Sequence, residues 1–382
     1  MKSHPRGSLS FAPVFAALAL VALAPALQAQ LAYRQKNLVS DLPGVAQYTD
    51  ANLVNPWGIA SGPATPFWVS NAGAGNTTLY NTAGTPLPLV VSIPHPAGGP
   101  AVPTGQVFNG SATSFNGNRF IFADARGTIA GWRPALGPTA ETMVNNSAAG
   151  ASYLGVATAT SGSNDYLYAA NFTQGRIDAF SSTNAPASLT GSFTDPTLPI
   201  GYAPFNIQNL GGSLYVTYAK VNDEGDEEET GAGFGFVNRF DTEGNLLGRV
   251  ASNGVLNAPW GLAIAPATGF GPFDGSLLVG NFGDGTINAF DLVSGDLLGT
   301  LKDSNGNPLV IEGLWGLRFG NGGAGGKPGT LYFAAGIQDE THGLFGSISP
   351  VPEPSTYAAF AAVGLIAVIM LRRRRAAKPV VT

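Results

Sequence analysis

One sequence pattern recurs about every fifty residues along this chain. NPWGIA begins at Asn55, APWGLAIA at Ala258 and GLWGLRFG at Gly313, and a short apolar segment follows each of them. Less similar copies lie between, and the equivalent anchor positions of the series are Trp57, Gly105, Gly155, Asn206, Trp260 and Trp315. A period of roughly 20–50 residues is typical of solenoids and propellers. The spacing therefore predicts six structural units.

The fifth unit indicates what each repeat forms. WGLAIA, SLLVGNF, TINAFD and LLGTL follow one another and are separated by turns rich in Gly, Asp and Asn. Four short strands with such turns are typical of an antiparallel meander. Four-stranded units in radial repetition form a β-propeller, so we predict an all-β, six-bladed β-propeller. An open β-solenoid and a two-sheet sandwich are the alternatives, and the turn spacing fits them less well.

The sixth unit supplies only three strands, LWGLRF, TLYFAA and LFGSIS. The segment Tyr33 to Ser40, YRQKNLVS, precedes the first Trp-Gly pair and can serve as the missing outer strand. A blade shared between the two ends of the domain would close the ring and protect two sheet edges. The propeller is therefore predicted to span residues 30–350 with terminal-strand closure.

The repeats resemble known propeller families. An apolar strand that ends in Asn or Asp before a glycine turn is similar to the NHL and YWTD propellers. The body between the two ends also resembles a family of bacterial proteins with an Asn-Pro-Trp-Gly signature, here Asn55 to Gly58. Both resemblances imply the propeller fold, and neither implies an activity.

The N-terminal end predicts export. Lys2 and Arg6 precede an apolar stretch from Leu9 to Ala24, and ALQAQ offers the small residue Ala29 at a cleavage point. This arrangement is typical of a secretory signal peptide, predicted here for residues 1–29. Signal peptidase is the processing enzyme that it implies.

The C-terminal end carries a second targeting pattern, for which we expect residues 351–377 to be the unit. Pro352, Glu353 and Pro354 precede an apolar span from Tyr357 to Leu371 and then the four arginines Arg372, Arg373, Arg374 and Arg375. Fifteen helical residues reach about 22 Å, against a bilayer core of ~30 Å, but snorkelling arginines offset such a deficit. The basic flank predicts a transmembrane helix 357–371 with its C-terminus in the cytoplasm.

This tail resembles the PEP-CTERM sorting signal of Gram-negative bacteria. The resemblance implies that exosortase processes the tail near Pro-Glu-Pro and that the body, after transient anchoring in the inner membrane, reaches the cell surface or the exopolysaccharide matrix. A plain single-pass anchor without processing is the alternative.

Composition excludes several kinds of site. The chain has no cysteine, which removes thiol nucleophiles and thiolate metal sites, and its three histidines lie apart in the sequence. No G-x-S-x-G segment occurs, and the loop GNGGAGGKP has Pro328 where a phosphate loop requires Ser or Thr. The net charge is −5 and the only dense basic run is the tail, so nucleic acid is not predicted as a partner.

An acidic segment in the fourth unit is one candidate site. VNDEGDEEETG contains six carboxylates within seven positions, and the predicted calcium ligands are Asp223, Asp226, Glu227, Glu228 and Glu229. Calcium takes six to eight oxygen ligands, which carboxylates and backbone carbonyls supply. The spacing differs from the EF-hand pattern, and a solvated insertion kept extended by charge repulsion is the alternative.

A second candidate lies at the ends of the second strands, in a series of equivalent positions: Asn71, Asp124, Asn171, Tyr218 and Asn281. Such positions are expected around one face of the channel, where Asn71, Asp124, Asn171 and Asn281 could hold a metal or a sugar hydroxyl. Six-bladed lactonases and gluconolactonase-like hydrolases hold calcium there with Glu, Asn and Asp, but no Glu stands in register here. The alternative is that Asn and Asp cap turns.

The three tryptophans Trp57, Trp260 and Trp315 are a third candidate, since channel-facing indoles can stack on sugar rings. Tryptophans before the glycine of a first strand are also suited to wedge adjacent blades together. Asp339, Glu340 and His342 cluster in one loop, which we expect to be solvated.

These patterns together predict an exported, non-catalytic propeller that binds exopolysaccharide or a matrix protein. The alternative is a calcium-dependent hydrolase or lactonase that uses the channel residues.

Overall fold

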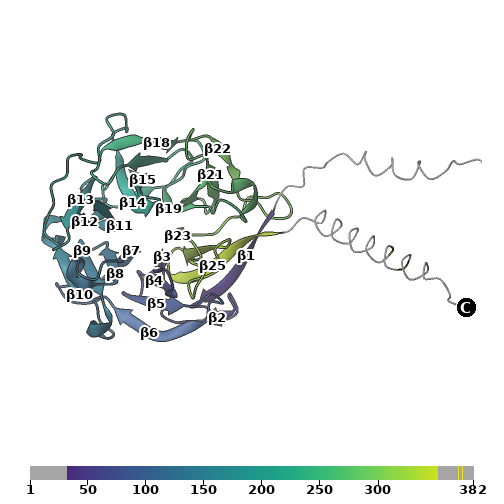
Figure 1. The fold of residues 1–382 in the computed structure, drawn as a ribbon, viewed down its shortest axis with the longest axis horizontal. Helices are drawn as coiled ribbons and strands as arrows, with labels where there is room; N and C mark the ends of the chain where they lie inside the picture. Colours follow the sequence, from purple (N-terminus) through teal and green to yellow (C-terminus); the bar gives the residue numbers. More distant parts are fainter. Residues whose placement is uncertain (1–31, 352–368, 370–371, 373–382) are drawn as a thin grey trace, which may run out of the picture. The chain divides into compact units, whose positions relative to one another are not determined.

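The computed structural model describes residues 32–351 and, in addition, residues 369 and 372. Residues Ala32–Val351 form one compact unit of short, mostly antiparallel strands. Six sheets surround a common centre, with the first strand of each nearest the middle (Figure 1). The predicted all-β, six-bladed β-propeller is confirmed.

We number the sheets as blades 1 to 6 in chain order. The first two blades have four strands each: β3 (Pro56–Ala60), β4 (Phe67–Asn71), β5 (Asn76–Tyr80) and β6 (Pro86–Ser92), then β7 (Pro103–Phe108), β8 (Phe120–Asp124), β9 (Thr128–Trp132) and β10 (Glu141–Asn145). Blade 3 has three strands: β11 (Tyr153–Ser161), β12 (Asn164–Asn171) and β13 (Arg176–Ser181). Single-turn 3-10 helices occupy four connections: η1 (Phe115–Gly117), η2 (Pro134–Leu136), η3 (Ser147–Ala149) and η4 (Gly271–Phe273).

Among the remaining blades, blade 4 has one extra short strand and blade 6 includes two strands from the opposite end of the domain. Blade 4 comprises β14 (Tyr202–Leu210), β15 (Ser213–Val221), the short β16 (Glu228–Glu229), β17 (Gly235–Phe240) and β18 (Leu246–Ser252). Blade 5 comprises β19 (Pro259–Ile264), β20 (Leu277–Asn281), β21 (Ile287–Phe290) and β22 (Leu297–Thr300). Blade 6 comprises β23 (Leu314–Phe319), β24 (Leu331–Ile337), β25 (His342–Val351), β1 (Ala32–Ser40) and β2 (Tyr48–Thr49).

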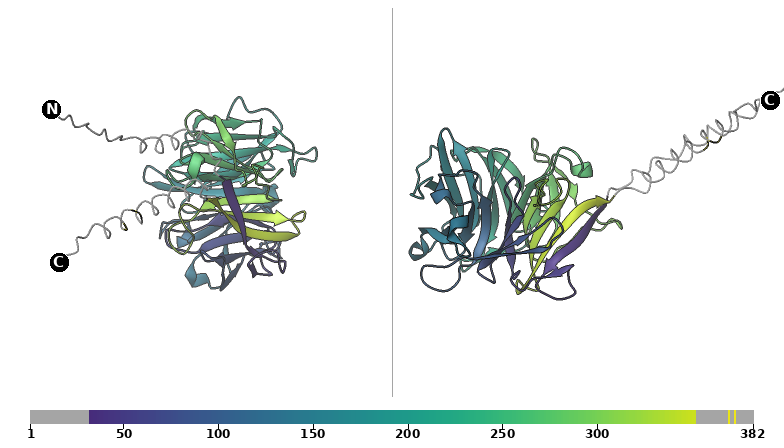
Figure 2. Two further views of the ribbon diagram at one scale, coloured as in Figure 1. Left: turned by 90° about the vertical axis from the view of Figure 1, so that its right-hand side faces the viewer. Right: turned by 60° about the horizontal axis from the view of Figure 1, so that its bottom comes forward.

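The predicted pairing of an N-terminal strand with the last blade is observed. β1 runs antiparallel to β25 from Ala32 opposite Val351 to Ser40 opposite Leu344. The purple β1 and the yellow β25 lie side by side in both views of Figure 2. The hydroxyl of Tyr33 also donates a buried hydrogen bond of 2.8 Å to the carbonyl oxygen of Phe270 in blade 5. This strand therefore joins the two ends of the domain.

Adjacent blades touch through glycines on their inner strands. A Cβ atom on Gly105 of blade 2 would lie 2.8 Å from Cα of Gly155 in blade 3. A Cβ atom on Gly316 of blade 6 would lie 2.4 Å from the carbonyl oxygen of Trp57 in blade 1. Only a residue without a side chain permits such close approach of two backbones. The contact at Gly316 joins the last blade to the first, so the inner strands complete the circle.

Apolar side chains fill the spaces between blades, because each sheet is covered on both faces. All five residues of β8, FIFAD, are buried, as are all five of β4. Trp68 of blade 1 stacks on Phe120 of blade 2 with ring centroids 4.0 Å apart. Strands buried on both faces read as continuous apolar runs, which is why alternation is weak in this sequence.

The predicted signal peptide 1–29, Pro352 to Pro354, the segment 357–371 apart from Ile369, and Arg373 to Arg375 lie outside the described residues. Arg372 and Ile369 are exposed and helical. No helix within the described part of the chain has the length and apolar character needed to cross a membrane.

Candidate functional site

The predicted channel residues Asn71, Asp124, Asn171 and Asn281 lie buried at equivalent second-strand ends in blades 1, 2, 3 and 5. Oδ1 of Asp124 accepts hydrogen bonds from the backbone N–H groups of Val102 (2.8 Å) and Arg126 (3.0 Å), and Oδ2 accepts one from the hydroxyl of Thr128 (2.6 Å). This carboxylate ties the loop that enters the first strand to the turn that leaves the second.

Asn171 and Asn281 form equivalent ties. Oδ1 of Asn171 accepts from the backbone N–H of Ser152 at 3.3 Å, and Oδ1 of Asn281 accepts from that of Asn257 at 3.2 Å. Asn71 instead donates to two side chains of β5, and its Oδ1 has no partner in the described part of the chain. The hydrogen bonds of these side chains stay within their own blades.

Tyr218, the fifth residue of the series, has a different environment. Its hydroxyl is buried without a hydrogen-bond partner in residues 32–351. Burial is the main cause that raises its pKa, and Asp195 and Arg249 lie close enough to exert opposing charge effects. Tyr218 belongs to the apolar cluster between blades 3 and 4, together with Phe236.

The three tryptophans meet at the centre of the ring. The indoles of Trp57 and Trp315 stack with centroids 3.4 Å apart, and Trp260 meets each of them edge-on at 5.9 Å. Phe282 stacks on the other side of Trp315 at 4.1 Å, and Phe205 meets the same ring at 5.7 Å. The tryptophans therefore pack between neighbouring blades, Trp57 and Trp315 joining blades 1 and 6 and Trp260 and Trp315 joining blades 5 and 6, and their rings also contact one another.

This packing leaves the tryptophans unable to receive a sugar ring. Trp260 and Trp315 are 1% and 0% exposed, and Trp57 is 8% exposed. They belong to one apolar cluster with inner-strand residues of blades 3 and 4, among them Leu154 and Phe205. The second-strand polar groups of blades 2, 3 and 5 are engaged in turns, whereas in blade 1 the Oδ1 atom of Asn71 has no partner among residues 32–351.

The acidic insertion, residues 222–231, follows β15 and forms a compact turn rather than an extended loop. Oδ1 of Asn222 accepts hydrogen bonds from the N–H groups of Gly225 (2.8 Å) and Asp226 (3.1 Å). Glu229 pairs with Lys220 at 2.5 Å, in register with the short β15–β16 ladder. The other predicted ligands of this segment, Asp223, Asp226 and Glu227, are exposed and Glu228 is half-buried.

Glu228 is electrostatically coupled to a carboxyl group of blade 6. Burial, together with the negative charges of Glu340 and Glu227, raises the pKa of Glu228 to about 8. Burial also raises the pKa of Glu340, and the charge of Glu227 adds to this effect. The Glu228 carboxyl is therefore mainly protonated at neutral pH. No three His, Asp or Glu side chains of residues 32–351 converge as metal ligands would.

Glu340 occupies the turn between β24 and β25, in the loop that the sequence predicts to be solvated. Gln338, Asp339 and Glu340 all have positive φ, at 55°, 52° and 62°. Left-handed conformation costs about 1–2 kcal/mol per non-glycine residue. The turn places Oε1 of Glu340 3.0 Å from the indole nitrogen of Trp315, which donates a hydrogen bond to it. His342, which the structure places as the first residue of β25 and not in this turn, contacts Asp41 through Nδ1 at 2.6 Å.

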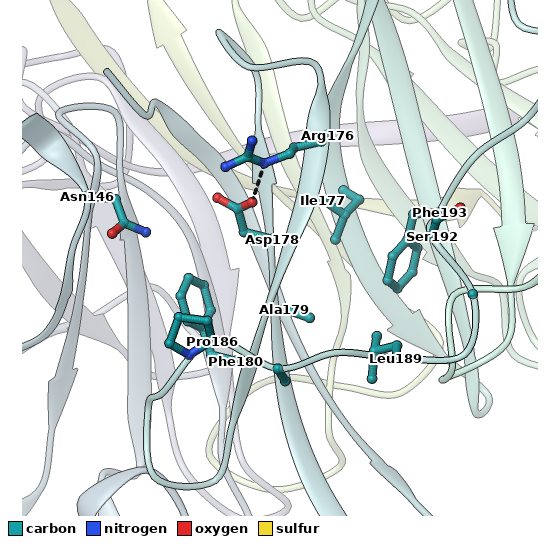
Figure 3. Close-up of a pocket in the computed structure, with 12 residues that line it drawn as sticks. Asn146, Arg176, Ile177, Asp178, Ala179, Phe180, Pro186, Leu189, Ser192 and Phe193 are labelled. Carbon is teal, nitrogen blue, oxygen red and sulfur yellow. Dashed lines mark hydrogen bonds and ion pairs between the residues drawn. The ribbon is translucent and has the colours of Figure 1, made fainter. Parts of the chain in front are cut away.

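A cleft of about 330 Å³ lies beside β13, the last strand of blade 3 (Figure 3). One wall is β13 and the other is the segment 186–193, which includes Leu189 and Phe193. In the position of a fourth strand, that segment forms one bridge, Pro186 with Phe180, and then departs. The charged rim of the cleft is the ion pair between Nε of Arg176 and Oδ1 of Asp178, at 2.6 Å.

Sequence reasoning missed this cleft. The repeat predicted four strands per unit, and blade 3 has three. A signal was present, because residues 182–198 (STNAPASLTGSFTDPTL) contain two prolines and many Ser, Thr and Asn but no apolar alternation.

Comparison with known proteins identifies the two parts of the chain. Residues 350–375 match the family model described as the PEP-CTERM protein-sorting motif. The chain is 34% identical over 330 residues to uncharacterized protein R648 of Acanthamoeba polyphaga mimivirus, which covers 81% of this chain and 78% of that protein. The predicted sorting motif is confirmed, and it implies export and processing by exosortase.

Solved structures share the fold at low sequence identity. A glucose dehydrogenase is similar with a TM-score of 0.54 and 13% identity, covering 84% of this chain and 100% of that chain. A protein of unknown function from Bacteroides thetaiotaomicron is similar with a TM-score of 0.52 and 14% identity, covering 84% and 77%. Such likeness concerns the fold alone. In this chain a six-bladed β-propeller is followed by a PEP-CTERM sorting motif. This chain belongs to the same protein family as mimivirus protein R648.

Proposed function

We propose that this protein is a non-catalytic binding protein that is sorted by exosortase to the cell surface or exopolysaccharide matrix of a Gram-negative bacterium. In this proposal the signal peptide directs export, the tail anchors the chain transiently in the inner membrane, and the propeller then binds a matrix polysaccharide or protein.

The single observation that supports binding over catalysis is the stack of Trp57 on Trp315 at the centre of the ring. Enzymes of propeller fold commonly need a cavity lined by polar groups that converge on a substrate. Here indole rings occupy that place, and Asp124, Asn171 and Asn281 use their polar atoms to hold turns within their own blades. The surfaces left for recognition are the outer faces and edges of the blades.

The test uses the propeller body, residues 32–351, which contains all the strands that the structure describes together with their partners. The body is mixed with cell-free matrix from an exosortase-bearing bacterium, and co-sedimentation is measured against heat-unfolded body. We expect sedimentation with the matrix and no turnover of a panel of lactones. Lactone hydrolysis that Asn171→Ala or Asn281→Ala abolishes would replace the proposal with the calcium-dependent hydrolase.

A further inference from the structure

The edge of blade 3 has main-chain groups that the other blades pair. In the other five blades a fourth strand covers the third: β6, β10, β18, β22 and β1. In blade 3 the N–H of Ala187 donates to the carbonyl of Ala179, and the N–H of Ser181 donates to the carbonyl of Ala185. These two bonds show that residues 177, 179 and 181 direct their backbone groups outward.

The ladder stops after those two bonds. If it continued, Ala179 N–H and both backbone groups of Ile177 would be paired, but no backbone partner exists for them within residues 32–351. The chain instead crosses to blade 4, where Gly191 N–H donates to the carbonyl of Glu243 at 2.8 Å. Figure 3 shows Ile177 on the strand and Leu189 on the diverging segment, with the cleft between them.

We infer that this cleft binds an extended peptide segment of another protein, which adds to β13 as the missing fourth strand. Strand addition uses main-chain hydrogen bonds for affinity and side-chain pockets for specificity. Blade 6 of this protein already accepts its outer strand, β1, from the far end of the domain. A donated strand is thus compatible with the geometry of these blades.

Charge selects the kind of segment. Asp178 is saturated, because its Oδ2 accepts from Tyr153 (2.9 Å) and Asn171 (2.8 Å) and its Oδ1 accepts from Nε of Arg176 (2.6 Å). The side chain of Arg176 is 60% exposed and uses only Nε in these contacts. Its terminal guanidinium groups therefore favour an acidic residue on the added strand, beside an apolar residue that meets Leu189 and Phe193.

The probe follows from blade 2, where the fourth strand is present. There Asn145 of β10 lies opposite Thr128, the first residue of β9. Arg176 is the equivalent first residue of β13, since Thr128 pairs with Asp124 and Arg176 with Asn171. A fluorescent peptide of residues 142–147 carrying Asn145→Glu would therefore place a carboxylate opposite Arg176, and it ends before the positions opposite Ala179 and Phe180, which Ala187 and Pro186 occupy.

The experiment measures binding of this peptide to the propeller body by fluorescence anisotropy. We expect binding that weakens at least tenfold when alternate peptide amides on the bonding side are N-methylated, and little when the intervening amides are. Ile177→Pro, which removes an outward donor at an edge position where proline is tolerated, should weaken binding by a similar factor. Arg176→Ala should reduce the affinity to that of the peptide with Asn145 unchanged.

Amide hydrogen exchange of the unmodified protein, with and without the peptide, tests the inference even if a variant misfolds. The amide of Ile177 should exchange fast in the free protein and slowly with the peptide. Absence of binding at ~1 mM peptide, where even weak specific binding is detectable, or binding insensitive to the position of N-methylation, overturns the inference. Such a result would leave co-sedimentation with the matrix unaffected if another surface binds it. The proposed function is therefore tested independently of this inference.

Discussion

The indole of Trp57 in blade 1 lies nearly parallel to that of Trp315 in blade 6, with an interplanar angle of 15°. The same two residues flank the seam where the ring closes, because the carbonyl oxygen of Trp57 lies against Gly316. Aromatic packing and a close backbone approach therefore stabilise one junction, between the first and last blades.

Removal of the Trp315 indole from the centre of the propeller should lower the stability strongly. Trp315→Ala leaves a cavity among Trp57, Trp260 and Phe282, and we expect the free energy of unfolding to fall by about 3–5 kcal/mol. Urea denaturation of the propeller body measures this loss. Val310→Ala, at a side chain that is 62% exposed, is the control and should change it by less than ~0.5 kcal/mol. A loss below ~1 kcal/mol for Trp315→Ala would contradict a packed centre.

A methyl group at the seam should also destabilise the ring. Gly316→Ala forces a Cβ atom towards the carbonyl oxygen of Trp57, and we expect a loss of about 1–3 kcal/mol in the same assay. Gly110→Ala is the matched control, because Gly110 is exposed and an added Cβ atom there would lie 3.9 Å from its nearest neighbour, Phe108. Equal stability of the two variants would show that blades 6 and 1 are not in close contact.

The coupled carboxyl groups predict a pH effect. Since the pKa of Glu228 rises from 4.5 to about 8 on folding, the folded protein keeps a proton that the unfolded chain releases in that window. Glu228 therefore contributes nothing below pH ~4.5 and destabilises the fold increasingly up to pH ~8. Allowing for solvent screening, Glu228→Gln should be more stable than wild type by about 1–3 kcal/mol at pH 9 and equal to it at pH 4.

Thermal unfolding across this pH range tests the sign. Glu224→Gln removes a charge from the exposed part of the same insertion and is the control. A stabilisation by Glu228→Gln that is the same at pH 4 and pH 9 would rule out titration as its cause.

The acidic insertion should not need calcium. Asn222 and Lys220 already hold its turn, so we expect the melting temperature in millimolar calcium to equal that in chelator within ~1 °C. A bound ion at 100-fold excess over Kd would add ~2.7 kcal/mol. If the melting temperature rises, Asp226→Ala and Glu227→Ala, compared with Asn171→Ala and Asn281→Ala, separate an insertion site from a site at the second-strand ends.

The sorting motif predicts a change of destination. Glu353→Ala should leave the protein in the inner-membrane fraction of an exosortase-bearing host, because the Pro-Glu-Pro segment is the feature that processing is expected to require. Cell fractionation and the mass of the C-terminus measure the outcome, with Glu224→Ala as the control. Surface delivery equal to that of wild type would show that Glu353 is dispensable for sorting.

The sequence was sufficient to predict the six units and the outer strand of blade 6. Turn glycines and the Trp-Gly anchors repeat with the blades, and Tyr33 to Ser40 was the one strand-like segment left for an incomplete unit. These features depend on local conformation and on spacing along the chain, both of which can be read from the sequence.

Contacts across the ring could not be predicted in the same way. Trp57 and Trp315 meet only because the ring closes, and no spacing along the chain encodes which side chains point to the centre. Glu340 reaches Trp315 through a left-handed turn without glycine, so its conformation carried no composition signal. The exposed edge of β13 exists because blade 3 lacks the fourth strand that the repeat predicts.

The pairing of β1 with β25 has a consequence for biogenesis. During synthesis and export the chain emerges from its N-terminus, so β1 appears first and its partner appears last. β2, which follows β1 at once in the chain, can pair with it early, but the antiparallel partner β25 arrives only when nearly the whole body has been made, and only then can the circle form. The match to the sorting motif begins at Pro350 within β25, so the strand that completes the circle is also the strand that leads into the motif.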